Sequence, residues 1–183
     1  MTDDDDLAWE TLDSRVAYSC EGFDIYNEDV RFPNGETSEF DYLSENEAVV
    51  VLPFTPDGDV VVIEEWRQAV KRVNSSIPAG SIEADDDDIE AAAHRELAEE
   101  TGYEAGSVEH LTTVEPANGF ADSVFHYYVA YDCEPLSEQD LDYNESIRVD
   151  TTTLDDLLAA ARADDLRDGR SAMAVLYYAL FER

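Results

Sequence analysis

Positive charge is almost missing from this chain of 183 residues. It has 11 Lys and Arg residues against 45 Asp and Glu residues, a formal net charge of −34, and Lys71 is its single lysine. Because proteins that bind nucleic acids present a basic face, we expect no nucleic-acid partner. Self-repulsion of this size destabilises a compact state in dilute buffer, whereas salt at about 1 M screens charges within ~3 Å. The composition therefore predicts a halophile's protein, adapted to a salt-rich cytoplasm.

Cysteine and long apolar runs are also scarce. Cys20 and Cys133 are the two cysteines, without the spacing of a metal site or a disulfide framework, so we expect two buried, apolar side chains. No apolar stretch approaches the ~18 residues of a membrane span. The first residues, MTDDDDLAWE, lack the basic start and apolar run of a secretion signal. We therefore expect a cytoplasmic protein with no membrane contact.

The pattern of strands and helices predicts an α/β fold with two parts. Residues 1–45 form an acidic segment followed by short antiparallel strands, which turn at Pro33-Asn34-Gly35. We expect residues 1–13 to be frayed or loosely packed, with Trp9 as an anchor. Residues 46–183 form the main domain. Its two continuously apolar runs, 48–53 and 60–63, flank an Asp57-Gly58 turn and are predicted to pair as a buried hairpin. Further strands and two C-terminal helices follow.

One predicted helix carries an unusual polar face. Glu96, Glu99 and Glu100 stand at i, i+3 and i+4, so a helix places three carboxylates side by side, opposite an apolar stripe. Like charges at this spacing are destabilising unless a cation binds among them, and Mg²⁺ and Mn²⁺ prefer oxygen ligands. With no activated Ser, Cys or His nearby, the cluster indicates metal-assisted attack of water on a pyrophosphate. The structural alternative is a solvated acidic helix.

The order of residues in this stretch resembles the Nudix box. Residues 95–103, RELAEETGY, match the second half of the box, Arg-Glu-aliphatic-x-Glu-Glu-x-Gly followed by an aliphatic or aromatic residue. The family has a Glu that pairs with the box Arg, with seven residues between the two, and Asp87 stands at that position relative to Arg95. Gly80 then lies one residue further upstream than the first Gly of the family. The resemblance implies an Asp87–Arg95 pair and an α/β/α sandwich, a mixed sheet flanked by helices.

The same resemblance implies a set of site residues. Metal ligands for Mg²⁺ (or Mn²⁺) would be Glu96, Glu99, Glu100 and the carbonyl of Ala79. The catalytic groups would be Glu99, Glu100, Arg95 and Glu145, the last as a metal ligand or general base. Substrate contacts would come from Arg67, Gly80 and Phe120. For Arg67 and Glu145, an ordinary surface charge is the alternative.

Motifs outside the box resemble the ADP-ribose pyrophosphatase group of the family. They are Trp66-Arg67-Gln68, Ile77-Pro78-Ala79-Gly80, Asn118-Gly119-Phe120 and residues 145–149. This likeness implies hydrolysis of ADP-ribose, or a related ADP-sugar, to AMP and a sugar phosphate. It also implies a homodimer in which the N-terminal strands complete the partner's site, with Phe23 or Tyr26 stacking on adenine.

Two alternatives remain open. The chain could hydrolyse another nucleoside diphosphate derivative, such as NADH or GDP-mannose, or a nucleoside triphosphate. It could also be a catalytically silent Nudix-fold sensor, although a pure binder has no need of three adjacent carboxylates.

Overall fold

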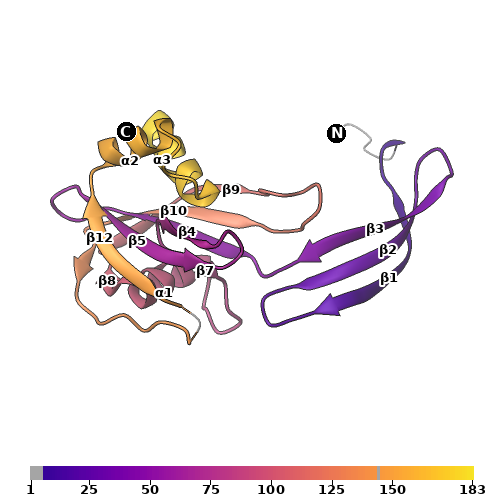
Figure 1. The fold of residues 1–183 in the computed structure, drawn as a ribbon, viewed down its shortest axis with the longest axis horizontal. Helices are drawn as coiled ribbons and strands as arrows, with labels where there is room; N and C mark the ends of the chain where they lie inside the picture. The colour runs from indigo at the N-terminus through magenta and orange to yellow at the C-terminus, as the bar shows by residue number, and fades with distance from the viewer. Residues whose placement is uncertain (1–5, 144) are drawn as a thin grey trace. The chain divides into compact units, whose positions relative to one another are not determined.

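The computed structural model describes residues 6–143 and 145–183, which divide into two units. The first comprises the chain up to Asn46 together with Glu115–Val124, and the second comprises Glu47–Val114 and Phe125–Arg183. The elements (Figure 1) are β1 (Glu10–Ser19), β2 (Asp24–Arg31), β3 (Thr37–Ser44), β4 (Ala48–Pro53), β5 (Val60–Arg67), β6 (Arg72–Ser76), β7 (Ala79–Ser81), α1 (Ile89–Thr101), β8 (Tyr103–Glu104), β9 (Ser107–Val114), β10 (Phe125–Tyr131), β11 (Glu134–Pro135), β12 (Ile147–Thr152), α2 (Leu154–Arg162) and α3 (Gly169–Phe181).

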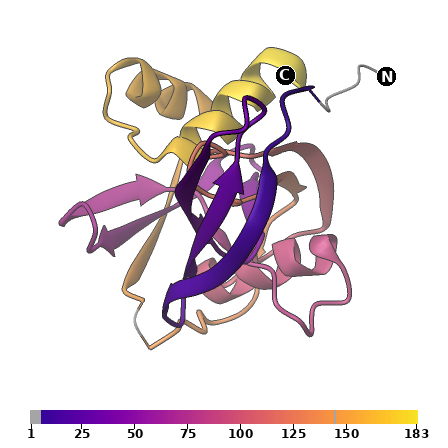
Figure 2. The same ribbon diagram turned by 90° about the vertical axis from the view of Figure 1, so that its right-hand side faces the viewer.

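The first unit contains the predicted N-terminal strands. β1, β2 and β3 form an antiparallel sheet in that order, with the turn between β2 and β3 at residues 32–36 (Figure 2). Residues 10–13 are not frayed, because β1 already begins at Glu10, although every residue of β1 is exposed; residues 1–5 lie outside the described part. Trp9 packs edge-on against Phe32 and Phe40, with ring centroids 4.5 and 5.7 Å apart. Aromatic packing therefore anchors the start of this sheet.

The second unit is the predicted α/β/α sandwich. Strand β4 lies between β7 and β10 in the sheet β7-β4-β10-β9, where it runs parallel to β10. Val50 and Leu52 face one apolar cluster, which contains residues of α2 and α3, while Val49 and Val51 face a second cluster, which contains residues of α1. Both faces of β4 are therefore covered by helices (Figure 1), which is why its sequence is apolar at every position.

The predicted hairpin between residues 48–53 and 60–63 is wrong. β4 and β5 belong to different sheets, because β5 pairs with β12 and β6 in the order β12-β5-β6. Only an isolated bridge between Phe54 and Val60 joins the two segments. Two fully apolar runs around a tight turn do not reveal which sheet each run enters.

The two cysteines differ. Cys133 is buried, as expected, whereas Cys20 is exposed, so the prediction for Cys20 is wrong. Burial raises the pKa of the Cys133 thiol to about 12, which keeps it in the inert thiol form. Among the described residues, no helix has the length and apolar character that crossing a bilayer requires.

Candidate active site

Specific residues cap the box helix α1 at both ends. Asp88 is its N-cap and accepts a hydrogen bond from the backbone N–H of Ala91 at 2.8 Å. The helix ends at Gly102, which adopts the left-handed conformation with φ of 74°. A Cβ at Gly102 would lie 2.6 Å from the carbonyl oxygen of Ser137, so space as well as conformation favours glycine. These caps define the face from which the three glutamates project.

Gly80 is the point where the β7 strand touches this face. A Cβ built on Gly80 would lie 2.1 Å from Oε2 of Glu96 and 2.2 Å from its Cδ. Real Cβ atoms do not approach other atoms this closely, so a side chain at position 80 would displace the carboxylate. Glycine therefore lets the Glu96 side chain lie directly against the backbone of β7.

Arg95 holds the polar face of α1 in place with all five of its N–H donors. Its Nη1 donates to Glu96 Oε1 and Glu99 Oε2 at 2.8 and 2.9 Å. Its Nε and Nη2 bind the two oxygens of Asp86 at 2.9 and 2.8 Å, and Nη2 also donates to the Ser81 carbonyl at 2.9 Å. This arrangement explains why the pKa of Asp86 is lowered, chiefly by its hydrogen bonds from Arg95.

The prediction that Asp87 pairs with Arg95 is therefore wrong, because the partner is the preceding residue, Asp86. With Asp86 as the partner, five residues separate Gly80 from the acid, as in the family pattern, and the additional residue falls between the acid and Arg95. A shorter Asp in place of Glu still reaches the guanidinium with both oxygens. Counting back from Arg95 could not reveal where the extra residue lies.

Glu96 and Glu100 are carboxylates in an enclosed setting. Burial raises the pKa of Glu96 to about 7, against the opposing effect of Arg95. Burial raises the pKa of Glu100 to about 8; the Ala79 N–H, which donates to Glu100 Oε2 at 3.0 Å, opposes the rise, and the charges of Glu96 and Glu145 add to it. Negative charge on these two groups is therefore poorly compensated within the protein alone.

This donor set fits a hard divalent cation. Carboxylate oxygens are the ligands that Mg²⁺ and Mn²⁺ prefer, and a cation would offset the negative charge of Glu96 and Glu100 that the protein compensates only in part. Within residues 6–143 and 145–183, no three Asp, Glu, His or Cys side chains converge as a ready metal cage. Glu96 and Glu99 instead share Nη1 of Arg95. Arg95 binds one oxygen of each of these two carboxylates, which leaves Oε2 of Glu96 and Oε1 of Glu99 for a cation.

Glu145 faces the box carboxylates from the loop before β12. Its charge raises the pKa values of Glu96, Glu100 and Glu65, which indicates that the four carboxylates are neighbours. Oε2 of Glu145 accepts a hydrogen bond from the N–H of Asp142 at 3.1 Å. The structure thus brings Glu145 close to the helix residues with which the sequence grouped it.

Arg67 and Glu65 lie together on one face of β5. Their ion pair measures 2.7 Å between Arg67 Nη2 and Glu65 Oε2, and only 8% of the Glu65 side chain is exposed. The angle of this contact is not that of a hydrogen bond, so Oε2 of Glu65 has no hydrogen-bond partner within the described chain. Burial raises the pKa of Glu65. Sequence reasoning missed Glu65, although its i, i+2 spacing from Arg67 places both on the same strand face.

The remaining candidates belong to the first unit. Phe120 is 65% exposed, and its carbonyl accepts a hydrogen bond from Leu43 at 2.9 Å. Phe23 lies 6.2 Å from Tyr18, and Tyr26 stacks on Tyr42 at 5.4 Å, both measured between ring centroids. Each of these contacts is internal to the N-terminal sheet and its adjoining loop.

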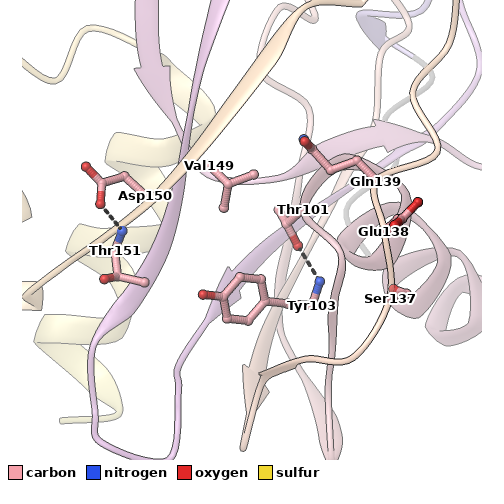
Figure 3. A pocket seen from close by; sticks show the side chains of 8 residues that line it. All are labelled: Thr101, Tyr103, Ser137, Glu138, Gln139, Val149, Asp150 and Thr151. Atoms are coloured by element: carbon pink, nitrogen blue, oxygen red, sulfur yellow. Dashed lines mark hydrogen bonds between the residues drawn. The ribbon is translucent and has the colours of Figure 1, made fainter.

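A cavity of about 550 Å³ opens beyond the C-terminal end of α1 (Figure 3). None of the box glutamates lines it. The residues that do are Thr101, Tyr103, Ser137, Glu138, Gln139, Val149, Asp150 and Thr151. The nearby loop supplies hydrogen-bond donors to the carbonyl groups in the last turn of α1. Gln139 Nε2 donates to the Glu100 carbonyl at 2.6 Å, and the N–H of Asp140 donates to the Glu99 carbonyl at 3.0 Å. This hollow belongs to the support of α1 rather than to its carboxylate face.

Comparison with known proteins agrees with this geometry. The model of the NUDIX domain matches residues 45–172, so the chain belongs to the Nudix family. Its fold and its carboxylate helix are those of a Nudix pyrophosphohydrolase.

Among the relatives, the chain is 33% identical to an ADP-ribose pyrophosphatase of Bacillus subtilis, over 96% of this chain and 95% of that protein. It is 32% identical to a methanol dehydrogenase activator of Bacillus methanolicus, over 94% of each. A crystal structure described as an ADP compounds hydrolase superposes with a TM-score of 0.82 over 93% of this chain and 92% of that chain, at 22% identity. That structure shares the fold.

Proposed function

We propose that this protein hydrolyses the pyrophosphate bond of ADP-ribose, or of a related ADP-sugar, to AMP and a sugar phosphate. The observation that carries the proposal is the carboxylate face of α1, where Glu96 and Glu100 lie enclosed beside Arg95 in a chain resembling an ADP-ribose pyrophosphatase over almost its whole length. The substrate class follows from the relative's name, and the chemistry follows from the residues.

The chain's own residues divide the work. Arg95 fixes Glu96 and Glu99, the Ala79 N–H fixes Glu100, and Gly80 admits the Glu96 carboxylate. Glu96, Glu99 and Glu100, with the Ala79 carbonyl, would hold Mg²⁺ (or Mn²⁺), which, when bound, neutralises phosphate oxygens and lowers the pKa of water. Glu145, on a loop facing the cluster, is suited to accept the proton of the attacking water. Arg67 is suited to contact a phosphate oxygen through its planar guanidinium.

A second substrate deserves a parallel test because of another relative. The chain is 29% identical to a GDP-mannose pyrophosphatase of Citrobacter koseri over 72% of each protein. The two reactions would share the carboxylates and differ only in contacts to the base and the sugar. The sensor alternative predicts nucleotide binding without turnover.

A substrate panel tests the proposal. Purified protein in molar KCl with Mg²⁺, then with Mn²⁺, is given ADP-ribose, GDP-mannose, NADH and ATP in parallel, and nucleotide release is followed. The proposal predicts a clear preference for ADP-ribose with AMP as product. Turnover of GDP-mannose alone would replace the substrate, and binding without turnover in a folded sample would favour a sensor.

We also propose that the protein works in the cytoplasm of a halophile, as a homodimer. The support for the halophile is a net charge of −34 spread along the chain, which molar salt screens. The homodimer is what the resemblance to the ADP-ribose pyrophosphatase group implies. Dialysis from molar KCl into dilute buffer should then unfold the protein, with loss of the far-ultraviolet circular dichroism signal. An unchanged spectrum would contradict the halophile assignment, and a monomeric mass in molar KCl would contradict the dimer.

A further inference from the structure

The start of α3 is tied directly to the segment that precedes the box. The N–H of Ile77 donates a hydrogen bond to Ser171 Oγ at 3.0 Å. Ser171 in turn donates to Asp168 Oδ1 from its N–H at 2.9 Å and from its Oγ at 2.7 Å. Ile77 stands two residues before Ala79, whose N–H holds Glu100. The first turn of α3 is therefore fixed beside the carboxylate face of α1.

Arg170 lies in this turn with most of its donors unused. Its Nε is 3.5 Å from Asp168 Oδ2, and 22% of its side chain is exposed. A guanidinium carries five N–H donors, yet that of Arg170 forms no hydrogen bond to any residue that the structure describes. Arg95, on the opposite side of the carboxylates, uses all five. Arg170 is thus half-buried, charged and open to a further acceptor.

Arg170 is also close to both Glu100 and Arg67. Its charge lowers the pKa values of Glu100 and Glu65, in each case against the larger effect of burial. The pKa of Asp168 is lowered by the charges of both Arg170 and Arg67 despite burial. Two guanidinium groups, from β5 and from α3, therefore stand near the same carboxylate, Asp168, and that of Arg170 also lies near Glu100.

We propose that Arg170 is a substrate-binding residue that, together with Arg67, donates hydrogen bonds to the phosphate oxygens of the nucleoside diphosphate. This inference rests on the proposed function and adds a residue to its site. The physical reason is charge: a chain with net charge −34 repels a polyanion, so the substrate needs local positive groups as well as a cation. A planar guanidinium matches phosphate oxygens in geometry and in charge.

Three variants test the role of Arg170. Arg170→Gln removes the charge and the fork of donors. Arg170→Lys keeps a positive charge beside Asp168 and Glu100 but loses the planar fork. Arg148→Gln is the matched control, because it removes the same positive charge as Arg170→Gln. Arg148 lies on β12, the strand beside β5, and binds Glu64 on the face away from Glu65. Each variant is prepared as the full chain in molar KCl, and its thermal unfolding is recorded.

The first readout is binding of inorganic pyrophosphate with Mg²⁺ by titration calorimetry, and the second is KM and kcat for ADP-ribose. Charge-assisted hydrogen bonds contribute roughly 1.5–3 kcal/mol, so Arg170→Gln should weaken pyrophosphate binding by about tenfold to a hundredfold. Its KM should rise by a similar factor, with a smaller change in kcat. Arg170→Lys should fall between Arg170→Gln and wild type, and Arg148→Gln should match wild type, because molar salt screens a remote charge.

Several outcomes would overturn this role. Wild-type affinity in Arg170→Gln, or in Arg170→Lys, would show that the guanidinium does not contact phosphate. Equal weakening by Arg148→Gln would assign the effect to overall charge. If Arg170→Gln unfolds, the folded Arg170→Lys variant decides. If wild type binds pyrophosphate through Arg170 but does not hydrolyse ADP-ribose, the proposed reaction fails while the role of Arg170 stands.

Discussion

The two sides of the carboxylate cluster differ in how completely their charges are matched. On the α1 side, Arg95 uses every donor on Asp86, Glu96, Glu99 and the Ser81 carbonyl. On the side of β5 and α3, Arg67 and Arg170 each form one ion pair within the described part of the chain, to Glu65 and Asp168 respectively. This difference indicates that the arginines around the carboxylates have two separate roles. Arg95 holds the protein's own carboxylates, whereas Arg67 and Arg170 have donors left for a ligand.

The largest effect is expected at the carboxylate between the two sides. Glu100→Gln removes the negative charge that the Ala79 N–H positions, and kcat should fall by roughly 10³-fold, the scale of a positioned electrostatic group in catalysis. The fold should persist, because glutamine still accepts that hydrogen bond. Steady-state kinetics with ADP-ribose measure the loss.

Glu90→Gln provides the control, because Glu90 is an exposed acid in the first turn of the same helix. It should leave the rate unchanged. A near-native rate in Glu100→Gln would remove Glu100 from the site.

A smaller loss of activity is expected when a carboxylate of α1 is moved but keeps its charge. In Gly80→Ala the new methyl group would meet Glu96 Oε2 at 2.1 Å, so the carboxylate must move. A misplacement of about 1 Å can lower the rate by roughly 10²-fold, and Mg²⁺ affinity, measured by calorimetry, should fall with it.

Gly22→Ala is the matched substitution, since a methyl group there meets no atom within 4 Å. It should behave as wild type. If Gly80→Ala kept full activity and metal affinity, the close approach of β7 to Glu96 would have no functional importance.

The next largest effect is expected on stability, from substituting two neighbouring aspartates. Asp86 is paired with Arg95 and Asp87 is not, so the two variants compare a paired charge with an unpaired one. Asp86→Asn removes the charge from the two-point contact with Arg95, and the free energy of unfolding should fall by on the order of 2 kcal/mol. Asp87→Asn should change it by less than about 0.5 kcal/mol, because Asp87 is exposed. Chemical denaturation in molar KCl measures both; equal effects would restore Asp87 as the partner of Arg95.

The smallest effect is a pH dependence of the same pair. The pKa of Asp86 is lower in the folded protein than in the unfolded chain, so its stabilisation is present above the unfolded pKa of about 4. It is lost as the pH falls through the folded pKa, because the native carboxylate must then take up a proton. Asp86→Asn should therefore differ from wild type in stability at pH 6 and converge with it in acid. A gap that stays constant with pH would contradict the pairing.

The sequence predicted the parts of the site that depend on local order along the chain. A helix in this stretch, with its three glutamates on one face, follows from their spacing. The α/β/α sandwich is confirmed, but the sheets of β4 and β5 were not predictable, because a fully apolar run has no preferred face. The role of Asp86 depended on where one extra loop residue lies.

The position of Arg170 on α3, near the carboxylates, could not be predicted from the sequence for a different reason. Arg170 lies 75 residues after Arg95, and its position beside Glu100 depends on the tertiary hydrogen bond between Ile77 and Ser171. Nothing in the local pattern of Asp168-Gly169-Arg170 distinguishes it from a capped surface helix. Glu65, in contrast, carried a signal in its i, i+2 spacing from Arg67.

The most direct test of the account is a metal titration of turnover. Protein freed of metal with a chelator is given ADP-ribose in molar KCl, and the initial rate of AMP release is measured as Mg²⁺ is added. The account predicts no turnover without metal and a saturable rise with Mg²⁺, which Glu100→Gln abolishes. Turnover in the presence of the chelator, or none in a folded sample at any Mg²⁺ or Mn²⁺ concentration, would contradict the claim that these carboxylates form a metal-dependent pyrophosphohydrolase site.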